Sequence, residues 1–85
     1  MYYIIYLGSE KMRILIIEDE YNLADVIQSS LKKQNYEVDI IQDGMDGYYE
    51  ALSNVYDLII LDVMLPRMNG FDILKKIREE DVLLH

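Results

Sequence analysis

Three carboxylates follow two short aliphatic runs in this chain of 85 residues. Glu18 and Asp19 come directly after ILII, and Asp62 comes directly after LIIL. Because an unpaired carboxylate is costly to bury, acids at the ends of apolar strands need a partner. A hard divalent cation such as Mg²⁺, held by a few oxygens and by water, would offset the repulsion among converging carboxylates.

The same acids have a purely structural interpretation. Asp19 and Glu20 could cap the helix that follows them or interact with its dipole. Taken singly, Glu18, Asp19 and Asp62 fit such a role better than a binding role. Taken together, at the ends of two strands expected to be neighbours, they favour a shared cation site.

The elements that must position these acids alternate between strand and helix. Short aliphatic runs indicate buried strands, and apolar residues at helical spacing indicate amphipathic helices. Asp43 is placed to cap the second helix, and Asn35 is placed as a left-handed stop after the first. The expected strands cover 13–19, 37–42 and 56–61, and the expected helices cover 21–33, 43–54 and 69–80.

This alternation predicts an α/β fold with parallel strands, right-handed crossovers and helices on both faces of the sheet. Ligands of such sheets bind beyond the carboxyl ends of the strands, where the strand order reverses. If the two crossovers run in opposite directions, the first and third strands are neighbours. Glu18, Asp19 and Asp62 then converge on one crevice.

Composition excludes several other classes of site. The absence of cysteine excludes disulfides and thiolate metal sites, and the net charge of −8 argues against nucleic-acid binding by this segment. No apolar run approaches the roughly 20 residues of a membrane span. We therefore expect no membrane contact and a cytoplasmic location.

Two motifs resemble the receiver domain of two-component response regulators. They are ILIIEDE (14–20) and LIILDVMLPRMNGFDIL (58–74), and the resemblance extends from residue 12 to about residue 80. In the second motif Pro66 lies four residues and Gly70 eight residues after Asp62, matching the family's turn into the third helix. The resemblance implies a flavodoxin-like fold.

The resemblance also implies a role for each residue that matches the family's pattern. Asp62 would accept a phosphoryl group from a sensor histidine kinase, and the protein would not be a turnover enzyme. Glu18 and Asp19 would bind Mg²⁺ together with Asp62, and the backbone carbonyl of Met64 would complete the metal site. The stretch DVMLPRMNG is typical of regulators that carry a winged-helix DNA-binding domain, which implies transcription regulation by the full-length protein.

The chain departs from the family in its later part. Receivers have five strand–helix units in the strand order 2-1-3-4-5, whereas this sequence predicts three units, for which the resemblance implies the order 2-1-3. The chain also contains no Thr to serve as the phosphoryl-binding hydroxyl. We therefore predict a truncated receiver domain over 12–85 and an N-terminal extension over 1–11, either non-native or an extra strand. Strand 56–61 would be an open edge that invites self-association, unless residues 2–7 (YYIIYL) supply a strand.

Two alternative functions remain open. One is an interaction-only fragment that binds metal or kinase but is not stably phosphorylated and does not switch. The other is a Mg²⁺-dependent phosphohydrolase, which also uses an Asp nucleophile. Such enzymes typically have a second Asp two residues later, where this chain has Met64.

Overall fold

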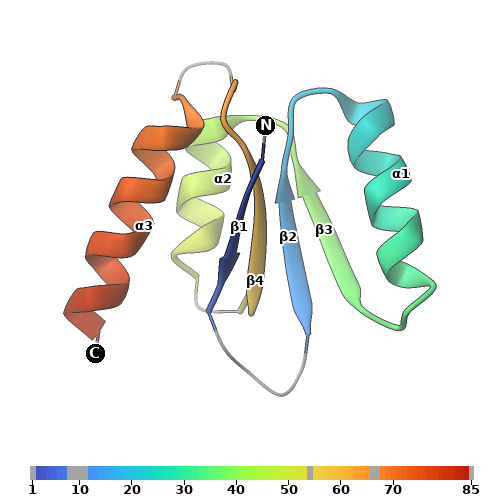
Figure 1. The fold of residues 1–85 in the computed structure, drawn as a ribbon, viewed down its shortest axis with the longest axis horizontal. Helices are drawn as coiled ribbons and strands as arrows, with labels where there is room; N and C mark the ends of the chain where they lie inside the picture. The colour runs from blue at the N-terminus through green and yellow to red at the C-terminus, as the bar shows by residue number, and fades with distance from the viewer. Residues whose placement is uncertain (1, 8–11, 54, 66–67, 85) are drawn as a thin grey trace.

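The structure, a computed structural model, describes residues 2–7, 12–53, 55–65 and 68–84 (Figure 1). All six predicted elements are present, and one further strand precedes them. The elements in chain order are β1 (Tyr2–Tyr6), β2 (Arg13–Ile17), α1 (Tyr21–Lys32), β3 (Glu37–Ile41), α2 (Gly44–Ala51), β4 (Leu58–Asp62) and α3 (Gly70–Leu84).

Local signals in the sequence set the ends of the first two helices as predicted. Asn35, after α1, has a φ of 69°, the left-handed conformation that reverses the chain after a helix. Asp43 caps α2, because its carboxylate accepts a hydrogen bond of 2.9 Å from the backbone N–H of Asp46.

The strands form one sheet with the order β1-β4-β2-β3. β2 pairs in parallel with β3 on one side and with β4 on the other. The predicted order 2-1-3 is therefore correct for the three parallel strands. In Figure 1 these strands end at the top of the sheet, and the N-terminal end of β1 lies at that same end.

β1 changes the predicted sheet at its edge. It pairs antiparallel with β4, with Tyr2 opposite Asp62 and Tyr6 opposite Leu58. The sheet is therefore mixed: the three predicted strands are parallel, and β1 supplies the extra strand that was predicted as the alternative to an open edge at strand 56–61. The predicted self-association through this strand loses its basis for the same reason. The division of the chain at residues 11 and 12 stays a prediction.

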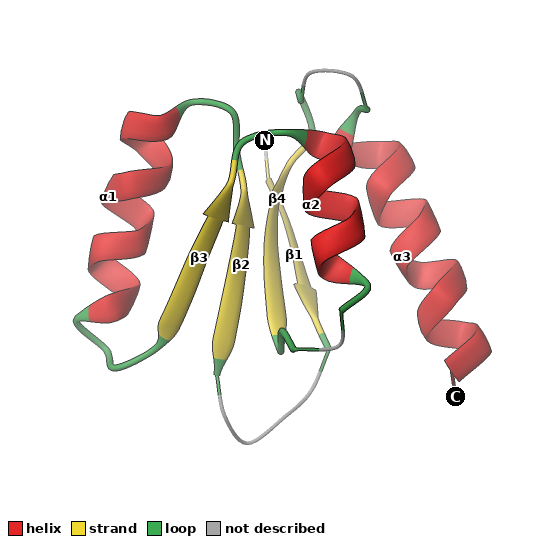
Figure 2. Ribbon diagram, turned by 180° about the vertical axis from the view of Figure 1, so that it is seen from behind, coloured by secondary structure: helices red, strands yellow, loops and turns green. Residues whose placement is uncertain are grey.

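Helices cover both faces of the sheet, as predicted. Figures 1 and 2 show α1 on one face and α2 with α3 on the other. The central strand β2 is buried on both faces: Leu15 and Ile17 belong to the core under α2 and α3, and Ile14 and Ile16 belong to the core under α1. Burial on both sides explains why this strand is aliphatic without alternation.

β1 is buried on one face only. Tyr3 and Ile5 pack against the core under α2 and α3, whereas Ile4 and Tyr6, on the other face, are 71% and 65% exposed. The Tyr3 ring also meets the ring of Phe71 on α3 edge-on, with 5.4 Å between centroids. β1 therefore contributes to the core as well as to the hydrogen bonding of the sheet.

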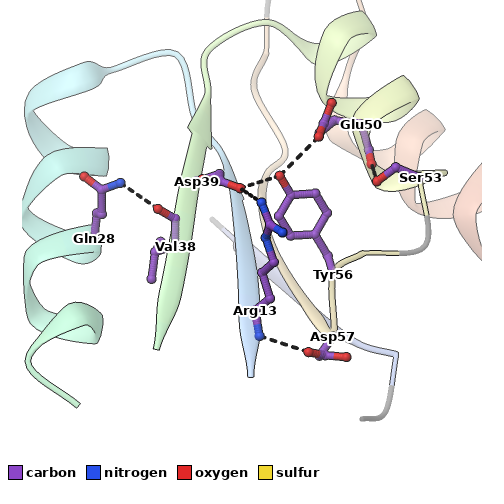
Figure 3. Close-up of polar contacts among 8 residues, drawn as sticks. All are labelled: Arg13, Gln28, Val38, Asp39, Glu50, Ser53, Tyr56 and Asp57. Atoms are coloured by element: carbon purple, nitrogen blue, oxygen red, sulfur yellow. Dashed lines mark hydrogen bonds and ion pairs between the residues drawn. The ribbon is translucent and has the colours of Figure 1, made fainter. Parts of the chain in front are cut away.

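A network of polar contacts joins β2, β3 and the segment that leads into β4 (Figure 3). The backbone N–H of Arg13 donates to Oδ2 of Asp57 at 2.9 Å, and the N–H of Asp57 donates to the carbonyl of Arg13 at 2.8 Å. The N–H of Leu7 donates to the carbonyl of Asp57 at 2.6 Å. The buried Asp57 thus links the starts of β2 and β4 to the end of β1.

Asp39 on β3 accepts two further hydrogen bonds in this network. The Tyr56 hydroxyl donates to its Oδ2 at 2.7 Å, and Nη2 of Arg13 donates to the same oxygen at 3.1 Å. The Tyr56 hydrogen bond and the Arg13 charge hold the pKa of Asp39 below its usual value of 3.8, although burial opposes them. The ionised form of Asp39 therefore stabilises the folded state.

Replacing Tyr3 with Ala tests the packing of β1. Tyr3→Ala should lower the free energy of unfolding by about 2 kcal/mol, because it removes a partly buried ring and its contact with Phe71. Tyr6→Ala in the same strand is the matched control and should change stability by no more than about 0.5 kcal/mol. Urea unfolding measures both values. Equal effects in the two variants would contradict the packing of β1 described above.

Replacing Asp39 with Asn tests the pH dependence of stability. Because the pKa of Asp39 is lower in the folded state, its contribution is complete above 3.8 and is lost as the pH falls below that value. Asp39→Asn should therefore be less stable at neutral pH and lose less stability in acid than the wild type. Asp25→Asn, a change at an exposed position of α1, is the control for urea midpoints across this pH range. If Asp39→Asn loses as much stability in acid as the wild type does, the contribution assigned to the Asp39 carboxylate is contradicted.

Candidate functional site

Glu18, Asp19 and Asp62 meet at the carboxyl ends of β2 and β4. Glu18 and Asp19 follow β2, Asp62 is the last residue of β4, and the two strands are adjacent and parallel. One carboxylate oxygen of each residue lies within 4.8 Å of the other two. The structure thus has the convergence expected from the sequence, while the role of these residues as ligands stays a prediction.

The three carboxylates differ in their exposure to solvent. Glu18 is 3% exposed and Asp62 is 9% exposed, whereas Asp19 is exposed. The backbone N–H of Glu18 donates to the carbonyl of Ile41 at 3.1 Å, which attaches the residue to the end of β3. The site is therefore buried at Glu18 and Asp62 and open to solvent at Asp19.

Burial and like charge destabilise the ionised form of Glu18. Burial, the proximity of Asp62 and a smaller effect of Asp19 raise the pKa of Glu18 to about 7, although a hydrogen bond from Tyr2 opposes the shift. Burial and the same three acids raise the pKa of the Tyr2 hydroxyl, which therefore remains a proton donor at neutral pH. A cation at this position would relieve the repulsion between Glu18 and Asp62.

The donor atoms fit a hard divalent cation. Oε2 of Glu18 is buried and has no hydrogen-bond partner among the residues that the structure describes. Buried polar atoms nearly always have a partner, so we expect this oxygen to bind a group that comes from outside the protein. Carboxylate oxygens are the donors that Mg²⁺ prefers, and Glu18, Asp19 and Asp62 are the residues that would hold it.

Helix capping accounts for Glu20 but not for Asp19. The Glu20 carboxylate accepts a hydrogen bond of 3.1 Å from the N–H of Asn22 and caps α1. Asp19 engages its neighbours through its backbone, because its carbonyl accepts a hydrogen bond of 3.2 Å from Nε2 of Gln42. The structural interpretation thus applies to Glu20 and leaves the Asp19 side chain for the acidic cluster.

The turn after β4 orients Asp62. The backbone N–H of Met64 donates to Oδ1 of Asp62 at 3.1 Å, and the Met64 side chain is 78% exposed. The exposure shows that packing does not require an apolar side chain at this position. The Met64 carbonyl as a metal ligand stays a prediction, and the predicted role of Pro66 lies outside the described residues.

Gly70 brings the start of α3 against the end of β4. Its N–H donates to the carbonyl of Val63 at 2.9 Å. A Cβ atom at this position would overlap the carbonyl oxygen of Asp62 and the Cα of Val63. Only glycine permits this approach, so the residue that the motif places eight positions after Asp62 sets the backbone around it.

Among the residues that the structure describes, Tyr2 contacts the site although the sequence analysis did not predict it. Its hydroxyl donates to Oε1 of Glu18 at 2.9 Å across a separation of 16 residues. The composition of YYIIYL identified a possible strand, but its direction and register decide which Tyr reaches the acids. No local signal in the sequence carries that information.

The fold and the site define a class: an α/β domain with an acidic cluster at the carboxyl ends of adjacent parallel strands. A family model for the response regulator receiver domain matches residues 14–84. The chain therefore belongs to the family of response regulator receiver domains. Among the described residues, no helix has the length and apolar character needed to cross a bilayer.

Curated relatives share this part of the sequence. The chain is 55% identical over 67 residues to the response regulator ArlR of Staphylococcus saprophyticus, covering 79% of this chain and 30% of that protein. It is 54% identical over 68 residues to ArlR of Staphylococcus aureus strain Mu50, covering 80% and 31%. The chain thus spans about a third of the length of these relatives.

Solved structures show the same fold. The signal receiver domain of a putative Luxo repressor protein from Vibrio parahaemolyticus has a TM-score of 0.78 at 32% identity, covering 85% of this chain and 55% of that one. The receiver domain of the Francisella response regulator 1452 has a TM-score of 0.79 at 24% identity, covering 85% and 60%. The second comparison supports the fold alone.

Replacing Gly70 with Ala tests the approach of α3 to Asp62. Alanine at a helix start would ordinarily stabilise by up to about 1 kcal/mol relative to glycine. Gly70→Ala should instead lower the free energy of unfolding by about 1–3 kcal/mol, because its Cβ would displace the backbone after β4. The sign of the change in the free energy of unfolding, measured by thermal or urea unfolding, distinguishes stabilisation by helix propensity from destabilisation by the close contact. A stabilised variant would contradict the close contact.

Proposed function

We propose that this chain is the phosphoacceptor segment of a two-component response regulator. Asp62 accepts a phosphoryl group from a phosphohistidine of a sensor kinase, in a reaction that depends on Mg²⁺. The observation that carries the proposal is the convergence of Glu18, Asp19 and Asp62 in a chain of the receiver family, where a buried Glu18 oxygen has no partner among the residues that the structure describes.

The geometry suits nucleophilic transfer to an aspartate. An Asp62 oxygen attacks phosphorus in line, a P–O bond forms, and the P–N bond to the kinase imidazole breaks with its electron pair moving to nitrogen. An ionised carboxylate needs no general base, and the Met64 N–H holds one of its oxygens. Glu18 and Asp19 would hold Mg²⁺, with the Met64 carbonyl as a further ligand. Bound Mg²⁺ would offset the negative charge of the phosphoryl group.

We extend the proposal to transcription regulation in the full-length protein. The support comes from the relatives named response regulator ArlR, of which this chain spans about a third. The charge of −8 disfavours DNA contact by this segment, so DNA binding would belong to an output domain elsewhere. Exchange with the kinase would take place in the cytoplasm, and the chain would act as a phosphoacceptor rather than as a turnover enzyme.

A second candidate function is favoured by the position of β1. In the strand order that the family resemblance implies, a further parallel strand would lie beside β4, where this structure has the antiparallel β1. The chain could then bind Mg²⁺ or the kinase without forming a stable phosphorylated state. This candidate shares the metal site with the first and differs in the fate of Asp62.

Phosphorylation of Asp62 is tested with a small acyl phosphate. In the presence of Mg²⁺, intact mass should show one added phosphoryl group on the wild type and on Asp25→Asn. The adduct should be absent in Asp62→Asn, which lacks the nucleophilic carboxylate, and in samples treated with a chelator. An adduct that persists in Asp62→Asn would refute the assignment. Mg²⁺ binding without any adduct would support the second candidate.

A further inference from the structure

Tyr2 reaches the acidic cluster from β1, which pairs with the edge of β4 that faces away from β2. β1 runs antiparallel to β4, and Tyr2 is the register partner of Asp62. Its hydroxyl donates to Oε1 of Glu18 at 2.9 Å. Of the side chains that the structure describes, Tyr2 alone donates a hydrogen bond to Glu18. The N-terminal strand therefore adds a neutral donor to a site otherwise composed of acids.

We propose that Tyr2 is a positioning residue for the metal site, which holds the Glu18 carboxylate by one oxygen and leaves the other for the cation. The inference rests on the proposed function, because it requires that Glu18 bind Mg²⁺. The two oxygens of Glu18 differ in the way the proposal needs: Oε1 accepts the Tyr2 hydrogen bond, and the buried Oε2 has no partner among the described residues.

Burial makes the Tyr2 hydrogen bond difficult to replace. Glu18 is 3% exposed, so water has little access to Oε1 when the hydroxyl is removed. A carboxylate that lost this donor would be free to rotate and would be less well solvated in its ionised form. Hydrogen bonds to metal ligands typically contribute about 10–100-fold to metal affinity, because they fix the ligand's orientation.

The hydrogen bond also couples β1 to the site. Tyr2 occupies its position only when β1 is paired with β4, and the pairing places the N-terminal end of β1 at the carboxyl ends of the parallel strands (Figure 1). If the hydroxyl favours the metal-binding form of Glu18, then bound metal must favour the docked form of β1 by the same factor. The N-terminal strand is thereby part of the site and not only of the sheet.

The test is Mg²⁺ affinity of the full chain, measured by isothermal titration calorimetry. Tyr2→Phe removes one oxygen and keeps the ring, and it should weaken Mg²⁺ binding about tenfold. Tyr6→Phe is the matched control and should leave affinity unchanged. Tyr6 lies on the same face of β1, and its hydroxyl makes no hydrogen bond to the described residues. Thermal unfolding without Mg²⁺ should show all of these variants folded, with similar midpoints for Tyr2→Phe and Tyr6→Phe.

Glu18→Gln separates failure of this inference from failure of the proposed function. If Glu18→Gln loses Mg²⁺ binding while Tyr2→Phe binds as the wild type does, the role of Tyr2 is refuted and the metal site stands. If Tyr2→Phe binds Mg²⁺ more tightly, the hydroxyl competes with the cation and the proposal is overturned. If Glu18→Gln binds as the wild type does, the metal assignment itself fails.

Discussion

The parallel pairing of β2 with β4, in register from Ile14 with Leu58 to Ile17 with Leu61, sets the distance between the acids that follow the two strands. Strands that run in the same direction end at the same edge of the sheet. Two aliphatic runs that pair in this way must therefore bring their terminal acids together. The core that forces the pairing consequently also forces the electrostatic repulsion, which a cation can relieve.

Two groups of carboxylates in the sheet differ in their hydrogen-bond partners. At the start of β2 and β4, Asp57 accepts a hydrogen bond from the N–H of Arg13. Asp39, in the middle of β3, accepts hydrogen bonds from Arg13 and Tyr56, and these donors favour its ionised form. At the carboxyl ends, Glu18 has a raised pKa and a buried oxygen that no described residue contacts by a hydrogen bond. The donors around Asp39 and Asp57 suit structural support, although Nε of Arg13 there is also buried without a partner among the described residues. The Glu18 oxygen lies among other acids, and it suits a cation that the protein does not itself contain.

β1 pairs with the edge of β4 and also contacts the acidic site. An aliphatic β4 with one unpaired side would expose a row of backbone hydrogen-bonding groups. Pairing with β1 satisfies them and packs Tyr3 and Ile5 into the core. The same register places Tyr2 at the acids. One strand thus completes the edge of the sheet and adds a hydrogen-bond donor to the site, and both effects depend on the antiparallel direction of β1.

The sequence by itself determined the parallel direction of three strands, the capping of α2 by Asp43 and the stop at Asn35, which follow from local chemistry and hydrophobic periodicity. The strand order, and with it the grouping of the three acids, followed from the resemblance of two motifs to a known family and from the rule that parallel strands end together. The neighbour of β4 on its outer edge was decided by the tertiary structure, because YYIIYL is compatible with several pairings. The role of Tyr2 was decided there too, since a one-residue change of register would turn its side chain to the other face.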